Sequence, residues 1–276
     1  MKNLFEKLSM KISDIIDYMP SFREARVTEE VVSLPPSFAS LKGRTLLFVS
    51  DIHLSRTFTL MALRRLIHQI DSYQPDMLLL GGDYAESSTW QRQFFKEISA
   101  IMPPLGIYAV VGNNDTECFS ENIDELRQIA AENGITLLMN ESVRVRAGAD
   151  YITVAGLDDF EYGSFPYCPL FDHTSASSLR ILLSHYPQGA AYYSAHIDGV
   201  QPHLAFSGHT HGGQFSLCGI TPFSVGFERR IHGMKLPAVS GWTNLKNTRL
   251  LVSDGIGTSR LPFRLCVPPV FHVIRL

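Results

Sequence analysis

The alternation of short apolar runs with helical patterns is the feature that most restricts the fold of this chain. Three apolar runs alternate with three amphipathic helical patterns in its first half. In chain order they occupy residues 46–49, 60–72, 77–80, 89–101, 107–111 and 121–133. Continuous apolar strands separated by helices are typical of parallel strands that are buried on both faces. We therefore expect a parallel sheet covered by helices.

After Gly134 the pattern changes to short alternating runs, which are typical of further strands. They occupy residues 142–147, 151–155, 179–183, 203–206, 249–252 and 270–275. We expect these runs to form a second sheet. The predicted fold class is α/β, an α+β sandwich of two mixed β-sheets packed face to face with flanking helices.

The N-terminal segment differs from the rest of the chain. Residues 4–19 form an amphipathic helical pattern, which either packs on the domain or lies in a membrane interface. Residues 20–43 are expected to be a connecting segment because they include Pro20, Pro35 and Pro36. The predicted organisation is an N-terminal helix and linker over residues 1–43 and one domain over residues 44–276.

Composition limits the partners and the compartment. A net charge of -3 and a pI near 6.4 provide no basic field for a nucleic-acid polymer. The four cysteines have no paired C-x-x-C spacing, which favours a reducing compartment. No apolar run is long enough to span a bilayer, and charges interrupt any signal-peptide core. We expect a cytoplasmic protein, either free or peripheral on the inner face of the membrane through residues 1–20.

Polar side chains stand where five of the apolar runs end. They are Asp51, His53, Asp83, Asn113, His185, His209 and His211. Each has an ordinary structural interpretation, because Asp often caps a helix, a lone His is often structural and Asn beside Gly is typical of a turn. If these residues had no common function, such interpretations would have to hold independently at five places, which is an improbable coincidence. Since ligands of α/β sheets bind beyond the carboxyl ends of the strands, we expect these side chains to converge.

The chemistry of these side chains indicates metal binding. Carboxylate, imidazole and amide oxygen without thiolate suit Mn²⁺ first, with Zn²⁺, Fe or Mg²⁺ as alternatives. The seven candidates exceed what a single ion with an open position needs from protein. The sequence therefore predicts two divalent ions that share one carboxylate.

The order of these motifs resembles that of a known family. D-x-H, G-D, G-N-x-D, a strand-end H and G-H-T-H, from about Thr45 onward, resemble the calcineurin-like metallophosphoesterase superfamily. The segments Gly208 to Gln214 and Asp254 to Ser259 are similar to those of a bacterial branch of small phosphodiesterases, several of which are membrane-associated. The resemblance implies the four-layer metallophosphoesterase fold and hydrolysis of phosphate esters.

The resemblance also implies a role for each residue. Asp51, His53 and His211 would bind one ion, Asn113, His185 and His209 the other, and Asp83 would bridge them. A metal-bridging water would lose its proton and attack phosphorus as hydroxide. Asp115 resembles the carboxylate that orients a neighbouring ligand or catalytic side chain.

Asn114 departs from the family pattern. Members that act on phosphomonoesters commonly have His there. The resemblance implies that this His acts as a general acid or donates a hydrogen bond to a phosphate oxygen. An amide cannot protonate a leaving alkoxide, although it donates a hydrogen bond. The sequence therefore favours phosphodiester or pyrophosphate cleavage, since these leaving groups need less acid help. The alternative is that His173 or His232 supplies the proton from a loop.

The sequence indicates the substrate less closely than it indicates the metal ligands. Arg229 and Arg230 are candidates for phosphate binding, or they form a solvated surface pair. The expected substrate is a phosphate-ester small molecule, or a lipid-linked or nucleotide-sugar compound cleaved by a UDP-diacylglucosamine-type pyrophosphatase at the membrane face. The alternatives are a cyclic-nucleotide or small-nucleotide phosphodiesterase, a phosphomonoesterase, and a non-catalytic scaffold. Loss of several ligands would indicate the scaffold, and none is missing.

Overall fold

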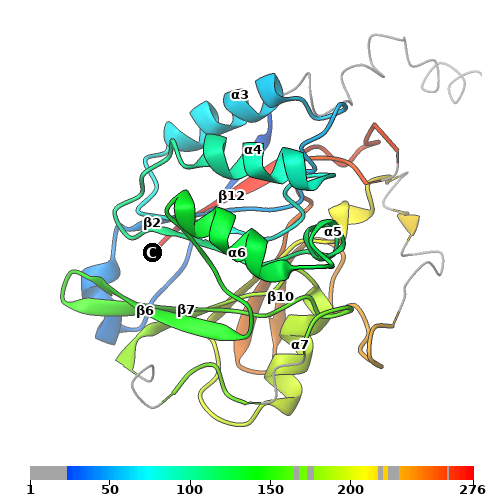
Figure 1. Ribbon diagram of the computed structural model, residues 1–276. Coiled ribbons are helices and arrows are strands. Elements are labelled where there is room, and N and C mark those ends of the chain that lie inside the picture. The colour runs from blue at the N-terminus through cyan, green and yellow to red at the C-terminus, as the bar shows by residue number, and fades with distance from the viewer. Residues whose placement is uncertain (1–23, 165–167, 173–176, 217–219, 223–229, 260) are drawn as a thin grey trace, which may run out of the picture.

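A computed structural model describes most of the chain (Figure 1). The described residues are 24–164, 168–172, 177–216, 220–222, 230–259 and 261–276. The predicted amphipathic helix over residues 4–19 lies outside them, and so do His173 and Arg229.

The first sheet contains the parallel strands that the sequence predicts. Its order is β1-β12-β2-β3-β4-β5, and β2, β3, β4 and β5 are parallel neighbours. The bounds are Arg26–Val31 for β1, Thr45–Val49 for β2, Met77–Leu80 for β3, Ile107–Ala109 for β4, Ile135–Leu137 for β5 and Val270–Arg275 for β12. Strands β2 and β3 are buried along their whole length, as their continuous apolar sequences predict.

The second sheet has the order β10-β11-β9-β8-β7-β6. Its strands are β6 (Glu141–Ala147), β7 (Asp150–Gly156), β8 (Leu179–Leu183), β9 (Leu204–Ser207), β10 (Gly241–Leu245) and β11 (Thr248–Val252). The hairpins β6–β7 and β10–β11 are antiparallel, and β7, β8, β9 and β11 are parallel neighbours. The sheet is therefore mixed, as predicted.

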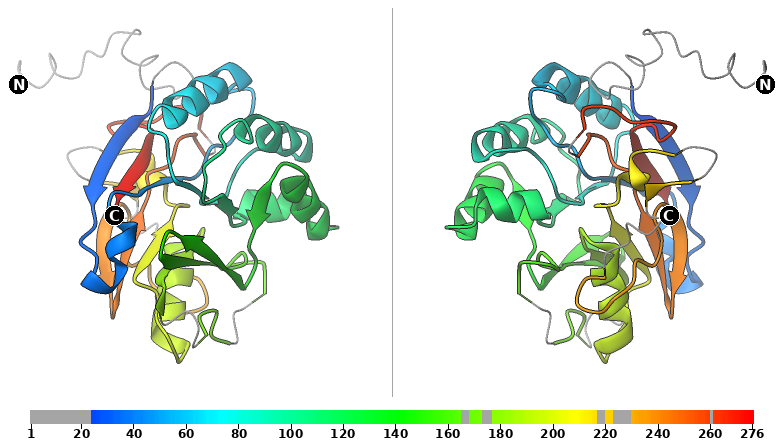
Figure 2. Two further views of the ribbon diagram at one scale, coloured as in Figure 1. Left: turned by 90° about the vertical axis from the view of Figure 1, so that its left-hand side faces the viewer. Right: turned by 90° about the vertical axis from the view of Figure 1, so that its right-hand side faces the viewer.

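Helices cover the outer faces of the two sheets (Figures 1 and 2). Helices α3 (Leu60–Asp71), α4 (Ser88–Ile98) and α6 (Ile123–Glu132) lie on the first sheet, and α7 (Pro187–His196) lies on the second. The side chains of Thr59 and Ser87 cap the N-termini of α3 and α4, because each accepts a hydrogen bond from a backbone N–H of the first turn. Shorter elements are α5 (Asn113–Cys118) and the 3-10 helices η2 (Pro36–Leu41) and η4 (His211–Gly213).

Three apolar clusters fill the interfaces between these layers. One packs the helices α3, α4 and α6 on the first sheet and includes Leu63, Phe94 and Ile129. A second fills the space between the sheets, where Phe48 meets Phe206 at a ring-centroid distance of 5.2 Å. The third lies between the second sheet and α7. The molecule is thus the predicted sandwich of two six-stranded mixed sheets with flanking helices.

The structure corrects two expectations. Residues 20–43 are not only a connecting segment, because residues 26–31 form β1 beside β12, and Phe38 and Leu41 are buried between the sheets. The apolar positions of this segment are sparse, so its pattern alone does not indicate a strand. Residues 270–275, expected in the second sheet, form β12 in the first, antiparallel to β2.

Among the helices that the structure describes, none combines the length and the apolar character needed to cross a membrane.

Candidate metal centre

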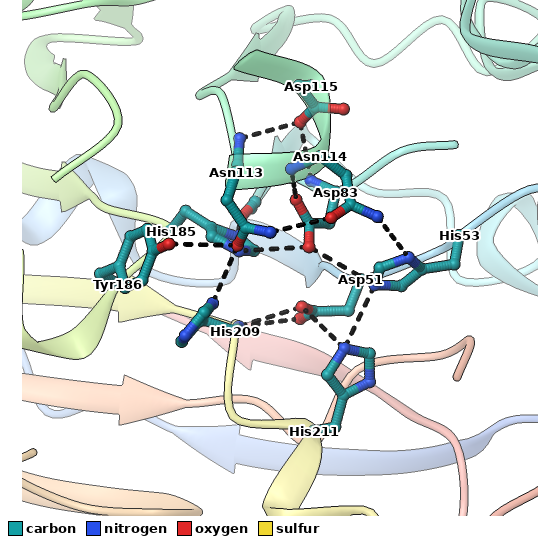
Figure 3. Close-up of polar contacts among 12 residues, drawn as sticks. Asp51, His53, Asp83, Asn113, Asn114, Asp115, His185, Tyr186, His209 and His211 are labelled. Atoms are coloured by element: carbon teal, nitrogen blue, oxygen red, sulfur yellow. Dashed lines mark hydrogen bonds and ion pairs between the residues drawn. The ribbon is translucent and has the colours of Figure 1, made fainter. Parts of the chain in front are cut away.

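The loops that follow β2, β3, β4, β8 and β9 meet at one place (Figure 3). These loops bring together all of the side chains that the sequence predicts as metal ligands. They are Asp51, His53, Asp83, Asn113, His185, His209 and His211. Asn114 and Asp115 stand in the same cluster. The predicted convergence of the strand ends is therefore confirmed.

The backbone of several candidate ligands is strained in the same way, with a positive φ angle. Five of the candidate ligands have positive φ angles: 53° at Asp51, 48° at His53, 54° at Asp83, 68° at His209 and 51° at His211. Non-glycine residues in this region each cost free energy of order 1–3 kcal/mol. Such strain is characteristic of functional sites, where surrounding contacts hold side chains in one orientation.

Two glycines allow the loops to approach so closely. A Cβ atom at Gly112 would lie 2.2 Å from Oδ1 of Asp83, and one at Gly208 would lie 2.3 Å from Oδ2 of Asp51. Neither distance is compatible with a side chain. Both positions therefore need glycine for the space that it leaves to a carboxylate.

One group of ligand atoms comes from Asp51, His53 and His211, which are all buried and lie within 4.8 Å of one another. Nε2 of His53 lies 3.2 Å from Nε2 of His211, and the latter lies 3.6 Å from Oδ1 of Asp51. Two imidazole nitrogens and a carboxylate oxygen so placed could hold a divalent cation.

A second group consists of Asp51, Asp83 and His185. Nδ1 of His185 lies 2.8 Å from the Gly81 carbonyl and donates to it, so in the neutral ring Nε2 is the nitrogen with a free lone pair. That Nε2 atom is buried and has no hydrogen-bond partner among the described residues. A buried nitrogen with this orientation fits a metal ligand.

Asp83 lies between the two groups. Its Oδ2 is 3.4 Å from Nε2 of His53 and 3.5 Å from Nε2 of His185. One carboxylate oxygen is thus within reach of both imidazoles. Asp51 is also close to both groups, so the structure offers two carboxylates that could be shared.

Asn113 and His209 lie at the rim. Oδ1 of Asn113 is 3.1 Å from Nδ1 of His209, and the Tyr186 hydroxyl donates to the same oxygen over 3.3 Å. Both residues line a cavity of about 890 Å³, together with Asn114, Glu117 and Tyr162. The buried ligand atoms therefore lie at the base of an open cavity.

The structure adds supporting residues that the sequence analysis missed. Oε1 of Glu86 lies 2.6 Å from Nδ1 of His53 and accepts a hydrogen bond from it, which leaves Nε2 of His53 free to bind a cation. A lone Glu three residues after Asp83 gives no sequence signal of this role.

Arg264 is a second such residue, and it is completely buried. Its Nη2 donates to Nδ1 of His211 over 3.1 Å, and its Nε donates to the Gly257 carbonyl over 2.6 Å. In the neutral His211 ring, Nε2 then carries the hydrogen, so ligation of a cation by that nitrogen would displace a proton. The contact also holds the ring in its orientation.

Asp115 does not line the cavity but lies beneath it. Its carboxylate accepts hydrogen bonds from the backbone N–H groups of Asp83, Tyr84 and Gly112 at 2.7, 3.1 and 2.8 Å, and from Gln91 at 2.8 Å. It thereby joins the loop after β3 to the loop after β4 and positions Asp83.

Burial and mutual charge control ionisation in the cluster. Burial lowers the pKa of His185, but the negative charge of Asp83 outweighs it and raises that pKa to about 10. Burial would raise the pKa of Asp83, yet attraction to His185 and His53 brings it below its ordinary value. Burial, together with repulsion from Asp83, raises the pKa of Asp115 to about 7. Ionised Asp83 thus faces a protonated His185, and a cation bound there would take the place of that proton.

Asn114 occupies the centre of this network. Its backbone N–H donates to Oδ1 of Asp83 over 2.9 Å, and its side-chain nitrogen lies 3.2 Å from Nδ1 of His53 and 3.4 Å from Glu86. Because it lines the cavity, its amide faces the space where a substrate would bind.

Two further candidates, His232 and Arg230, lie outside the lining of the cavity. His232 packs edge-on against Phe160 at 5.4 Å and is absent from the cavity lining. Arg230 is exposed, donates to the Gly233 carbonyl over 3.2 Å and does not line the cavity.

Comparison with known proteins agrees with the fold and the site. The family model described as calcineurin-like phosphoesterase matches residues 44–213. The chain therefore belongs to the calcineurin-like phosphoesterase family, and it is a phosphoester hydrolase.

Three relatives illustrate its similarity. An uncharacterized protein, YpbG of Bacillus subtilis (strain 168), is 28% identical over 284 residues, which cover 98% of each chain. The uncharacterized metallophosphoesterase YkuE of the same organism is 27% identical over 82% of this chain and 77% of its own. The UDP-2,3-diacylglucosamine pyrophosphatase LpxG of Chlamydia muridarum (strain MoPn / Nigg) is 27% identical over 88% of this chain and 86% of its own.

Proposed function

We propose that this protein hydrolyses a phosphodiester or pyrophosphate bond with two divalent cations. Asp51, His53 and His211 would hold one cation, Asn113, His185 and His209 would hold the other, and Asp83 would contribute to both. The observation that carries this proposal is the position of Oδ2 of Asp83, which lies within 3.5 Å of imidazole nitrogens on both sides. When bound, the cations would supply a nucleophilic oxygen and stabilise negative charge on phosphorus. Mn²⁺ is the proposed metal, since the donors are carboxylate, imidazole and amide.

The protein's own residues prepare this chemistry. Glu86 and the Gly81 carbonyl each accept a hydrogen bond from Nδ1 of a histidine, so that His53 and His185 present Nε2 to the centre. Asp115 holds the backbone of Asp83 in place. The Asn114 amide can donate to a phosphoryl oxygen but has no proton to release to a leaving group.

The amide side chain of Asn114 indicates which kind of phosphate bond the protein cleaves. A substrate whose leaving group is itself a phosphate or a stabilised alcohol needs little proton transfer, whereas an alkyl monoester needs much. We therefore favour a diester or a pyrophosphate. The Chlamydia relative is named a UDP-2,3-diacylglucosamine pyrophosphatase, which supports a pyrophosphate and, more specifically, a lipid-linked nucleotide sugar. Contact of residues 1–20 with the membrane would then bring the site to such a substrate.

The experiment compares three substrates on the Mn²⁺-loaded protein. We expect faster hydrolysis of bis(p-nitrophenyl) phosphate than of p-nitrophenyl phosphate, and hydrolysis of a UDP-linked acylated sugar. Asp83→Ala should reduce kcat at least about 100-fold, because both cations lose a ligand. Circular dichroism should show that the variant keeps its fold. A metal-loaded protein inert on all three substrates would refute the proposal.

A further inference from the structure

A second hollow lies directly beside the cavity of the metal centre. It measures about 490 Å³, and we name it the side groove, defined by Arg56, Glu86, Trp90, Thr258, Leu261 and Pro262. Glu86 lines both hollows, and the next residue after Thr258, Ser259, lines the cavity. Because Glu86 also contacts His53, the side groove begins one side chain away from the metal centre.

The charges of the two hollows are unevenly distributed. Glu86 stands between them, and the cavity is also lined by the carboxylate of Glu117. Arg56 is the only arginine or lysine among the described residues that line either hollow. Its side chain is exposed, and within the described part of the chain it has no ion-pair partner. An anionic group that extends out of the cavity would therefore be attracted to Arg56.

The backbone at Arg56 is held beside the site by short contacts. The N–H of Ser55 donates to the Phe58 carbonyl over 2.9 Å, and the Ser55 hydroxyl accepts from the N–H of Thr57 over 3.2 Å. The N–H of Glu86 donates to the Leu54 carbonyl over 3.2 Å, which joins this turn to the loop after β3. The guanidinium thus extends from a constrained turn, which lowers the entropic cost of binding.

The opposite side of the side groove is apolar. Leu261 is 49% exposed and Pro262 is exposed beside it, while Trp90 is partly buried against the core. Glu86 is the acidic residue among the described lining of the side groove and contacts His53, and the first turn of α4, where Trp90 stands, adds no further acidic side chain. A cation beside an aromatic and aliphatic surface suits a group that carries both a negative charge and an apolar or flat portion.

We propose that Arg56 binds the second phosphoryl group of a pyrophosphate substrate, and that Trp90, Leu261 and Pro262 contact the organic group attached to it. This inference rests on the proposed function and specifies its substrate class. In the reaction, water adds to the phosphorus in the cavity and the bond to the bridging oxygen breaks. The leaving phosphate keeps the electron pair, with its charge beside Arg56, and the water's second proton passes to solvent. This role is the one that the sequence suggested for Arg229 and Arg230, of which Arg229 lies outside the described residues.

A matched pair of substrates tests the inference. Bis(p-nitrophenyl) phosphate and the corresponding bis(p-nitrophenyl) diphosphate carry the same aryl groups and differ by one phosphoryl group. We expect Arg56→Gln to lower kcat/KM for the diphosphate about 10- to 100-fold, the range for loss of a charge-assisted contact. For the monophosphate diester the change should stay below about twofold. Arg56→Lys should restore part of the loss, and Arg146→Gln, an exposed arginine on β6, should leave both substrates unaffected.

A binding measurement gives a readout that does not depend on turnover. The chain contains two tryptophans, and Trp90 lines the side groove, whereas Trp242 stands on β10. The non-hydrolysable diphosphate α,β-methylene-ADP should change tryptophan fluorescence in the wild type, and Arg56→Gln should weaken its binding about 10-fold. Trp90→Phe should abolish the fluorescence change.

The outcomes separate the two proposals. Wild-type protein inert on both p-nitrophenyl substrates would refute the proposed function, and this inference with it. Wild-type protein that cleaves only the monophosphate diester would overturn the inference alone. The same holds if Arg56→Gln affects both substrates equally, or neither.

Discussion

At the scale of single residues, the chemistry of this centre depends on which hydrogen-bond partners hold each imidazole. His53 and His185 have carboxylate and carbonyl acceptors at Nδ1, so both present Nε2 to the centre. Asn114 stands beside them with an amide that lies 3.2 Å from Nδ1 of His53. We therefore propose that the residue at this position decides whether the site can also release a proton to a leaving group.

Replacing Asn114 tests that statement. We expect Asn114→His to raise kcat for phenyl phosphate, a monoester with a poor leaving group, by about 10-fold or more, since general acids contribute 10²–10⁴-fold. The rise should disappear above the pKa of the new imidazole. Asn114→Gln, which adds no titratable group, should show no rise. Equal rates for both variants would mean that a leaving group at this site receives no proton from residue 114.

At the scale of elements, the strand-end loops are held in strained conformations by close contacts. The backbone of Gly112 at the end of β4 approaches Asp83 so closely that a methyl group would collide with the carboxylate. Its own φ of -103° is ordinary, so the requirement for glycine is one of space rather than of conformation.

We expect Gly112→Ala to reduce metal affinity and kcat at least about 10-fold, because Asp83 must move to admit the methyl group. Gly134→Ala is the matched control. Gly134 has a φ of 73° and no neighbour within 4 Å of an added Cβ. That variant should lose about 1 kcal/mol of stability through strain and keep its activity. Metal binding by calorimetry and turnover of bis(p-nitrophenyl) phosphate provide the measurements.

The segment before β2 also belongs to the folded unit. Phe38 in η2 is 5% exposed and lies in the cluster between the sheets. We expect Phe38→Ala to lower the free energy of unfolding by about 3–5 kcal/mol in urea titrations. Met61→Ala, at a residue that is 68% exposed, should change it by less than about 0.5 kcal/mol. A loss below 1 kcal/mol for Phe38→Ala would show that this segment adds little to the core.

At the scale of the whole molecule, one buried histidine connects the two sheets. His272 in β12 contacts the Thr28 hydroxyl of β1 at 2.6 Å and the Ser253 hydroxyl after β11 at 2.9 Å. Burial lowers the pKa of His272 to about 4. The folded protein therefore holds this imidazole neutral, whereas the unfolded chain takes up a proton below its ordinary pKa near 6.5.

The sign of the pH dependence follows from this difference. The stability that neutral His272 contributes is complete above about pH 6.5 and is lost as the pH falls toward 4. At pH 5 the expected loss is about 2 kcal/mol relative to pH 7.5. Urea denaturation at both pH values should show it, and His272→Gln should reduce the difference between the two by that amount. An unchanged difference in the variant would assign the acid sensitivity to other groups.

The sequence by itself determined the class of fold and the membership of the site. Apolar runs buried on both faces must become central strands, and ligand-type residues at their ends must meet at one edge, because parallel strands present their carboxyl ends together. Periodicity is local, so it predicts α3, α4 and α6 closely.

Only the tertiary structure decided which strand lies beside which, and which distant residues support the ligands. β12 pairs with β2 across more than two hundred residues, and sequence periodicity contains no information on such pairing. Glu86 and Arg264 likewise act through contacts that their sequence neighbourhoods do not indicate. The position of Arg56 at the side groove depends on the meeting of three loops. The sequence specified the candidate ligands, and the packing of loops decided their orientation and the shape of the hollows beside them.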